Sequence, residues 1–353
     1  MAMGEIDNTY NFTGLVQRGD KAINERYRPQ TFHEIIGNSE TKKSLAGWME
    51  RGDKRSKSLL LVGGSGDGKT TTARILAMGL NCEHGDTVNP CCECSSCKAA
   101  MAGDAMHIKE YNMSALSTKD DADAIVNSLY DSSFTGRNTV AILDEIQGMS
   151  VGSQNLMLKM LENPPKNTYV ILATTDPQKI IKTIKTRCEI YEFRDPGTDD
   201  IKQMLGSVVK QELPSMPLEQ RKQILEACRG LGYREILMKL EKFIKGGGTG
   251  SIDEAFQPEF LSLAKSIMRG DLKGCMAEME RYDDTIDANS AKRVIRAFAC
   301  NQIKYSYEKG DVTGMKRSLA VFRIFDDGFY ADPKPIPSLK ADAIEACMIM
   351  AGM

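Results

Sequence analysis

The sequence predicts an α/β fold in which a parallel sheet carries a phosphate-binding loop, followed by helix-rich segments. Residues 63–70 read GGSGDGKT, which fits GxxxxGKT, between an apolar run at 59–62 and helical apolar spacing at 71–77. A second apolar run at 139–143 ends in two acidic residues. Beyond Phe193, Asp-Pro-Gly breaks this pattern and helical spacing takes over.

The GxxxxGKT loop is predicted to hold the phosphates of a nucleotide. Its glycines let backbone N–H groups curl around the β- and γ-phosphates, and the following helix N-terminus adds partial positive charge. Lys69 supplies a full positive charge, and the Thr70 hydroxyl can bind Mg²⁺. A glycine-rich turn without a ligand is the alternative, but it does not explain the flanking strand and helix. The expected nucleotide contacts are Gly63, Gly64, Ser65, Gly66, Asp67, Gly68, Lys69, Thr70 and Thr71.

Downstream strands are expected to supply the other half of this site. Asp144 and Glu145 end the second apolar run, where Asp144 would complete the Mg²⁺ shell and Glu145 would orient and polarise the attacking water. A third apolar run at 169–173 leads into Thr174 and Thr175, and the hydroxyl of Thr175 is a candidate contact for the γ-phosphate. An acidic pair that merely ends a strand is the alternative for Asp144 and Glu145.

Cysteines form a second motif. Four of the ten follow a Cx8CxxCxxC pattern and are expected to bind a structural zinc ion: Cys82, Cys91, Cys94 and Cys97. Four thiolates leave no open position on the zinc ion for water. We therefore expect the ion to cross-link an insertion of the fold and to take no part in catalysis. Cys92 and His84 lie close enough in sequence to substitute for a ligand, and disulfides are the alternative to zinc.

The amino-acid composition limits which kinds of partner the protein can attract. The net charge is −2 and the pI about 6.1, so no global basic field draws the protein to nucleic acid, and any DNA contact must be a local patch. A hydrophobic content of 41% is enough for two or three ordinary domains. The N-terminus is polar, and no apolar stretch reaches the roughly 18 to 20 residues of a membrane span. A cytoplasmic protein without a membrane partner is therefore expected.

Several motifs occur together in one order: ERYRPQTF at 25–32, IIGN at 35–38, the phosphate loop, the four cysteines, Asp144-Glu145, LENPP at 161–165, ATTDPQK at 173–179 and TRC at 186–188. In this order they resemble the ATPase subunit of a bacterial DNA polymerase III sliding-clamp loader, the zinc-containing gamma/tau type of AAA+ protein. The family usually has Ser-Arg-Cys and Leu-Glu-Glu-Pro-Pro where this chain has TRC and LENPP. Such departures fit a viral or divergent member.

The resemblance implies an organisation and an activity. It implies an N-terminal extension at 1–23, an AAA+ core at 24–194 with a zinc module at 82–97, a helical lid at 195–245 and an oligomerisation collar at 246–353. A helical bundle packed on its own core is the alternative for the last segment. It further implies an ATP hydrolase, with Mg²⁺ and structural zinc, that opens a sliding clamp when ATP binds and releases it closed on primer–template DNA after hydrolysis. The implied partners are the clamp, DNA of any sequence and other loader subunits in a pentameric assembly.

Individual side chains carry further expectations from the resemblance. Arg187 would reach the nucleotide of the neighbouring subunit as an arginine finger, with a surface salt bridge as the alternative. Arg234 would be the sensor arginine of the lid, with an exposed helical arginine as the alternative. Lys119 and the helix N-terminus near Ser153 are candidate contacts for DNA phosphates, although an exposed lysine is usually just solvated.

Two other functions remain open at this stage. A different AAA+ DNA-remodelling motor, such as a branch-migration helicase, shares the loop and the carboxylates but does not normally carry the cysteine insertion. A non-hydrolysing structural loader subunit would have a decayed site, whereas Lys69, Asp144, Glu145 and Arg187 are all present here.

Overall fold

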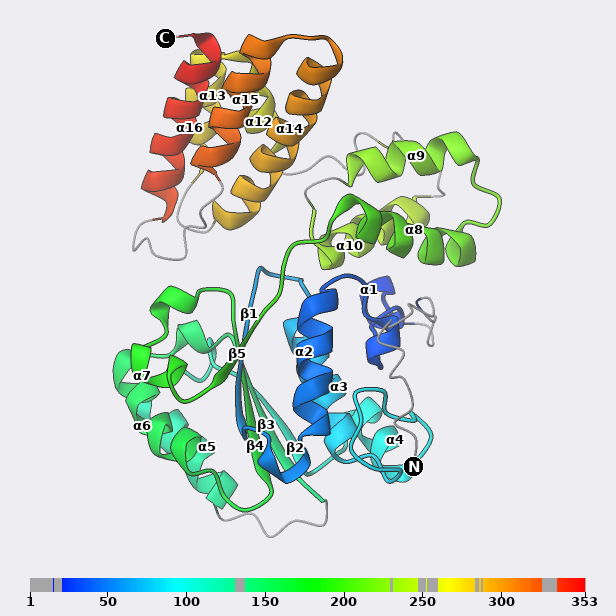
Figure 1. Cartoon of the computed structure of the whole chain (residues 1–353), viewed down its shortest axis with the longest axis vertical. Coiled ribbons are helices and arrows are strands. Elements are labelled where there is room, and N and C mark those ends of the chain that lie inside the picture. Colours follow the sequence, from blue (N-terminus) through cyan, green and yellow to red (C-terminus); the bar gives the residue numbers. More distant parts are fainter. Residues whose placement is uncertain are drawn as a thin grey trace, which may run out of the picture. The chain divides into compact units, whose positions relative to one another are not determined.

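The computed structural model describes residues 15, 21–130, 137–228, 231–246, 252, 260–282, 286, 288–325 and 335–352. The chain divides into two compact units, Met1–Asp195 and Pro196–Met353 (Figure 1). Most of the expected extension at 1–23 lies outside the described residues, and so does the glycine-rich stretch 247–250 at the start of the expected collar. The expected division into core, lid and collar stays a prediction.

The first unit is built on a five-stranded sheet in the order β2-β3-β4-β1-β5, and every neighbouring pair is parallel. The strands are β1 Ser58–Val62, β2 Ile108–Asn112, β3 Thr139–Asp144, β4 Thr168–Thr174 and β5 Glu189–Glu192. The three predicted apolar strands are confirmed within β1, β3 and β4. These strands are almost wholly buried, which explains why they read as continuous apolar runs rather than as alternating ones.

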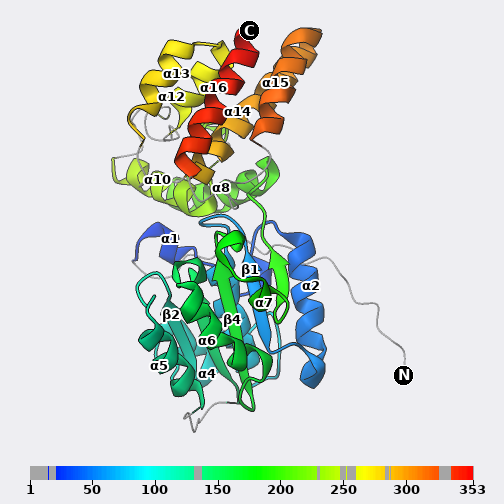
Figure 2. The same cartoon turned by 90° about the vertical axis from the view of Figure 1, so that its left-hand side faces the viewer.

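Helices cover both faces of this sheet. Figure 1 shows α2 Ser39–Glu50 and α3 Lys69–Leu80 on one face, and α5 Lys119–Tyr130, α6 Val151–Glu162 and α7 Lys182–Lys185 on the other. Figure 2 looks from the side of α5 and α6. Successive residues of β1 serve different cores, because Leu59 and Leu61 pack with α2 and α3 whereas Leu60 packs with α5 and α6.

Short elements complete the first unit. They are α1 Ile23–Arg26, η1 Phe32–Glu34, η2 Gly52–Lys54, α4 Ser95–Ala102, η3 Ile146–Gly148 and η4 Pro177–Lys179. Of these, η3 matters most for the site, because it follows β3 directly and positions the residues after Asp144.

All the regular elements described in the second unit are helices. Three helices come first, α8 Thr198–Glu212, α9 Leu218–Ala227 and α10 Tyr233–Lys245. Five more share one apolar core: α12 Leu261–Arg269, α13 Leu272–Met279, α14 Ala288–Glu308, α15 Val312–Ile324 and α16 Pro335–Ala351. The predicted helical spacing is confirmed here, since Leu263, Ala264 and Ile267 are all fully buried in that core.

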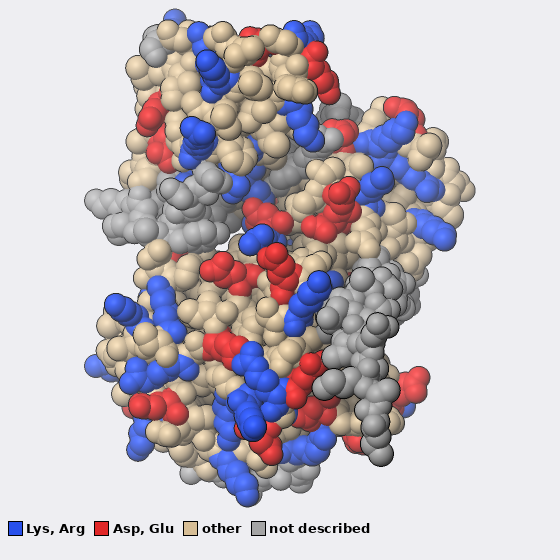
Figure 3. Space-filling view, viewed as in Figure 1, with Lys and Arg blue, Asp and Glu red and all other residues tan. Residues whose placement is uncertain are grey.

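Surface and hydropathy agree with the composition. On the face in Figure 3, Lys and Arg side chains are interspersed with Asp and Glu, so this face presents no broad field of one sign. Within the described ranges, no helix is both long and apolar enough to cross a membrane.

Candidate nucleotide site and cysteine cluster

The sheet brings the predicted site residues to one edge. Strand β4 lies between β1 and β3, so the loop after Val62, the threonines after β4 and the acidic pair after β3 are neighbours. Val62 pairs with Thr174, and the Gly63 N–H donates to the Thr174 carbonyl over 3.3 Å. The carboxyl ends of parallel strands are where open α/β sheets bind ligands.

The loop has the backbone that phosphate binding requires. Gly68 caps α3 at a φ of 97°, a conformation in which a residue with a β carbon is strained. The Lys69 ammonium donates to the carbonyls of Gly63 over 3.0 Å and of Gly64 over 2.7 Å. Because Lys69 is only 5% exposed, its charge sits inside the loop rather than in solvent.

Two oxygen ligands suited to Mg²⁺ meet beside the loop. The Thr70 hydroxyl donates to Oδ2 of Asp144 over 2.6 Å, and the Glu145 N–H donates to Oδ1 of the same carboxylate over 2.9 Å. Hydroxyl and carboxylate oxygens are the donors that Mg²⁺ prefers. The structure therefore brings together the loop and Asp144, although the sequence separates Thr70 and Asp144 by 74 residues.

Glu145 is held in an unusual backbone conformation. Its φ of 55° lies in the left-handed region, where residues other than glycine are uncommon and strained. Its Oε2 accepts from the Thr175 hydroxyl over 3.4 Å and from Nε2 of Gln147. Strain at a carboxylate beside a phosphate loop is typical of functional sites, where the surrounding contacts impose the geometry.

Gln147 is a residue that the sequence reasoning missed. Its Nε2 donates to the Thr175 hydroxyl over 2.8 Å, and its Oε1 accepts from the Thr174 hydroxyl over 2.7 Å and from the Thr175 N–H over 3.3 Å. A polar residue two positions after Glu145 was the only available signal, and it does not reveal contacts to β4.

Arg187 and Arg234 belong to two further elements. Arg187 follows α7 and donates to the Thr183 carbonyl over 3.1 Å, and its ion pair with Glu162 spans 3.4 Å. The side chains of this pair are 30% and 56% exposed, so solvent screens their interaction. Arg234 is exposed in the first turn of α10, in the second unit.

The four predicted cysteines gather into one cluster. The Sγ atoms of Cys82, Cys91, Cys94 and Cys97 all lie within 4.8 Å of one another. Sulfurs bound at about 2.3 Å to a tetrahedral ion stand about 3.8 Å apart, and Cys91 and Cys97 are 3.9 Å apart. All ten cysteines lie in the described part of the chain and are free thiols, so the disulfide alternative is not supported.

The local backbone stabilises the thiolate form of one cysteine in this cluster. N–H groups of Glu93 and Cys94 point at the sulfur of Cys91 and lower the pKa of its thiol to about 6, whereas burial raises the pKa of Cys97. Cys92 and His84 stay outside the group of four. The thiol of Cys92 contacts the Pro90 carbonyl at 3.5 Å, and Nδ1 of His84 lies 3.9 Å from the Cys82 sulfur.

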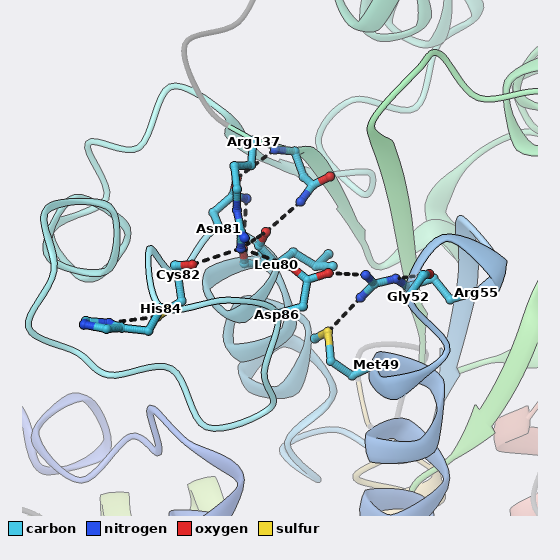
Figure 4. A network of polar contacts seen from close by, with 11 residues as sticks. Met49, Gly52, Arg55, Leu80, Asn81, Cys82, His84, Asp86 and Arg137 are labelled. Carbon is cyan, nitrogen blue, oxygen red and sulfur yellow. Dashed lines mark hydrogen bonds and ion pairs between the residues drawn. The ribbon is translucent and has the colours of Figure 1, made fainter.

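A polar network joins this insertion to the sheet (Figure 4). Asp86 pairs with Arg55 and, at 3.0 Å, with Arg137. The Arg137 guanidinium also donates to the carbonyls of Leu80 and Cys82 over 3.1 and 2.9 Å, which satisfies the C-terminal end of α3. The insertion is thus fastened both to the phosphate-loop helix and to the start of β3.

Arg55 is the buried member of this network. Its side chain is 4% exposed, and its guanidinium lies 5.5 Å from the ring centroid of Trp48 and 5.6 Å from that of Tyr169. Aromatic faces and the Asp86 carboxylate therefore compensate the desolvation of the charge.

This sheet order, loop and acidic pair are those of a P-loop α/β fold of the AAA+ type. Among solved structures, the chain resembles the RuvB Holliday junction branch migration motor of Thermotoga maritima, with a TM-score of 0.51, 17% identity and coverage of 78% of this chain and 90% of that one. A single-residue variant of the same protein gives a TM-score of 0.52 at 16% identity, over 78% and 90%. At such identity the likeness shows the fold alone.

Sequence comparisons show which proteins the chain is similar to. Residues 37–197 match a family model described as DNA polymerase III, delta subunit. The chain is 33% identical to DNA polymerase III subunit tau/gamma of Haemophilus influenzae over 199 residues, covering 56% of this chain and 28% of that protein. It is 34% identical to subunit gamma of Buchnera aphidicola subsp. Schizaphis graminum, covering 61% and 59%. These matches support a gamma/tau clamp-loader family protein, and the chain spans less than two thirds of the length of these two relatives.

Proposed function

We propose that the chain is an ATP-hydrolysing subunit of a DNA polymerase sliding-clamp loader. The contact between Thr70 and Asp144 carries the proposal, because it places an Mg²⁺-type ligand pair beside a phosphate loop in a chain of this family. Decayed sites lose such groups, whereas here the loop lysine, both carboxylates and the candidate finger are present. RuvB-like branch migration is the weaker candidate, because its support is the fold alone.

The residues of the first unit divide the work of hydrolysis. Lys69 and the N–H groups of the loop would bind the phosphates, and Thr70 and Asp144 would hold Mg²⁺, which neutralises charge on the phosphates. Glu145 would orient the attacking water, and Thr175, bonded to Glu145, would sense the γ-phosphate.

Arg187 is proposed to act on the nucleotide of a neighbouring subunit. Its ion pair with Glu162 is partly exposed, long and geometrically loose, so little free energy opposes its transfer to a phosphate in another chain. Arginine suits this role because its charge is permanent and its donors spread over several oxygens. Arg234 stays proposed, on the resemblance, as the sensor arginine of a lid.

The four-cysteine cluster is proposed to hold zinc in a structural role. The sulfur spacing and the N–H groups aimed at Cys91 support this ligand set. All four positions of a tetrahedral ion are then filled by protein, so zinc would fix the insertion rather than take part in hydrolysis.

DNA is proposed to be bound through its phosphates, which suits a loader that accepts any sequence. Lys119 begins α5, and its side chain lies close to Gly152 in the first turn of α6. A cation beside a helix N-terminus is a suitable phosphate contact. The clamp, primer–template DNA and further subunits in a five-membered assembly complete the proposal, on the resemblance.

ATP turnover by the purified chain, with and without primed DNA, clamp and companion subunits, tests this function. We expect ATP hydrolysis, and we expect DNA and clamp to stimulate it. Lys69→Ala should abolish hydrolysis, because the Lys69 ammonium lies inside the loop where the phosphates would bind. Lys54→Ala is the matched control, since Lys54 is an exposed lysine of the same unit. ATP binding without turnover would indicate a structural subunit, and turnover coupled to migration of a four-way junction instead of clamp loading would indicate the motor.

A further inference from the structure

Four hydrogen bonds concentrate on one side chain beside the acidic pair. The Gln147 amide contacts Glu145 and Thr175 through Nε2, and the Thr174 hydroxyl and the Thr175 N–H through Oε1. Gln147 belongs to η3, Glu145 directly follows β3, and the two threonines lie at the end of β4. One amide therefore ties together the ends of two strands and the turn that follows β3.

The surroundings dictate which way this amide points. The Glu145 carboxylate can only accept, so it must face the NH₂ group, and the Thr175 N–H can only donate, so it must face the amide oxygen. In a flipped amide, the oxygen would face the Glu145 carboxylate, which is also an acceptor, and the NH₂ group would face the Thr175 N–H, which is also a donor. The contacts with the threonine hydroxyls adapt to either direction, so the carboxylate and the backbone N–H fix the orientation.

We propose that Gln147 is a positioning residue that holds the Glu145 carboxylate and the Thr175 hydroxyl in one fixed arrangement for hydrolysis. This inference rests on the proposed function, in which Glu145 orients the water and Thr175 contacts the γ-phosphate. Gln147 itself contacts no phosphate in this account. Thr174 is fully buried and so supplies a rigid anchor for the amide.

The physical benefit is preorganisation. A free glutamate on a strained turn would sample several side-chain rotamers, and only some of them orient a water towards the phosphate. A carboxylate held by a neutral amide keeps its charge and loses this freedom before the substrate arrives. A shift of the β4 end would move Thr175 and Glu145 together, because the same NH₂ group contacts both.

Two variants separate positioning from structural support. Gln147→Ala removes all four contacts, whereas Gln147→Glu keeps the shape and the acceptor but removes the donors to Glu145 and Thr175. We expect kcat to fall about 10- to 100-fold in both, as small misplacements of a reacting group do. The KM and the dissociation constant for ATP should stay within about twofold of wild type, because the loop and Lys69 are unchanged.

Gln178→Ala is the matched control, because Gln178 is a glutamine that follows the same strand outside this network and should leave kcat unchanged. Thr175→Val adds a coupling test. If Gln147 and Thr175 act as one unit, the double variant should lose clearly less than the product of the single losses.

Wild-type kcat in both Gln147 variants, or a loss of ATP binding as large as the loss of turnover, would overturn the inference while leaving the proposed function intact. Wild-type protein without turnover would instead refute the proposed function, and this inference with it. The comparison of wild type with Lys69→Ala distinguishes the two failures.

Discussion

The hydroxyl of Thr70 donates to Oδ2 of Asp144 over 2.6 Å, which connects the first turn of α3 to the end of β3. The two residues are 74 positions apart in the sequence. The contact exists because the parallel order of β1, β4 and β3 brings their carboxyl ends to one edge of the sheet. The proposed Mg²⁺ site rests on this contact.

Thr70→Val removes this hydroxyl and keeps the shape of the side chain. We expect turnover to fall and the Mg²⁺ concentration for half-maximal activity to rise about 10- to 100-fold, because one ligand oxygen and its partner contact are lost. The measurement is ATP hydrolysis at increasing Mg²⁺. An unchanged Mg²⁺ dependence would contradict the assignment of Thr70 and Asp144 as ligands.

Arg55→Met tests how strongly the cysteine insertion is fastened to the core. The substitution leaves Arg137 as the remaining ion-pair partner of Asp86 and removes the contacts of a buried guanidinium with Trp48 and Tyr169. We therefore expect the free energy of unfolding to fall by about 2 kcal/mol or more. Urea denaturation measures this change.

Arg51→Met is the control for this experiment. Arg51 pairs with Glu189 at 3.0 Å, but its side chain is 48% exposed, so the stability should hardly change. Equal losses in the Arg51 and Arg55 variants would show that burial of Arg55 has no special weight.

Metal analysis tests the cysteine cluster. Wild-type protein should contain about one zinc ion per chain, and Cys94→Ser should lose it and melt at a lower temperature, because a structural metal contributes directly to folding. Cys92→Ser should keep the zinc, since the Cys92 sulfur lies outside the group of four. Cys300→Ser is an exposed control. Zinc-free wild-type protein, or zinc retained in Cys94→Ser, would refute the ligand set.

Glu162→Gln distinguishes the two interpretations of Arg187. If Arg187 serves only its salt bridge, Arg187→Ala and Glu162→Gln should behave alike. If Arg187 acts on a neighbouring nucleotide, Glu162→Gln should leave hydrolysis in the assembly at wild-type level or above, because it releases the guanidinium. Arg187→Ala should then lower hydrolysis by about 10³ or more. ATP turnover of the two assemblies is the comparison.

The sequence predicts which strands and helices form the site better than it predicts the residues at which they begin and end. The apolar runs before Gly63, Asp144 and Thr174 each correspond to an observed strand, because a strand buried on both faces must be apolar throughout. The helix expected near Ser153 begins at Val151. Such ends depend on capping contacts, which periodicity does not reveal.

Contacts between segments that are far apart in the chain could not be predicted from the sequence. Gln147 gave no pattern of its own, and its role depends on the position of β4 beside β3. Arg55 reads as one basic residue in a polar turn, yet Trp48, Tyr169 and Asp86 enclose it. The spacing of the four cysteines was informative because metal ligands must converge, and this requirement is written into the local sequence.

A hydrolysis site shared between subunits is the central proposal, and mixing two inactive variants in the assembly tests it directly. Lys69→Ala and Arg187→Ala should each be nearly inactive. In an equimolar mixture, some sites combine the intact loop of one chain with the intact arginine of its neighbour, so ATP hydrolysis should clearly exceed the sum of the separate activities. Hydrolysis no greater than that sum, or wild-type hydrolysis by Arg187→Ala alone, would contradict the account.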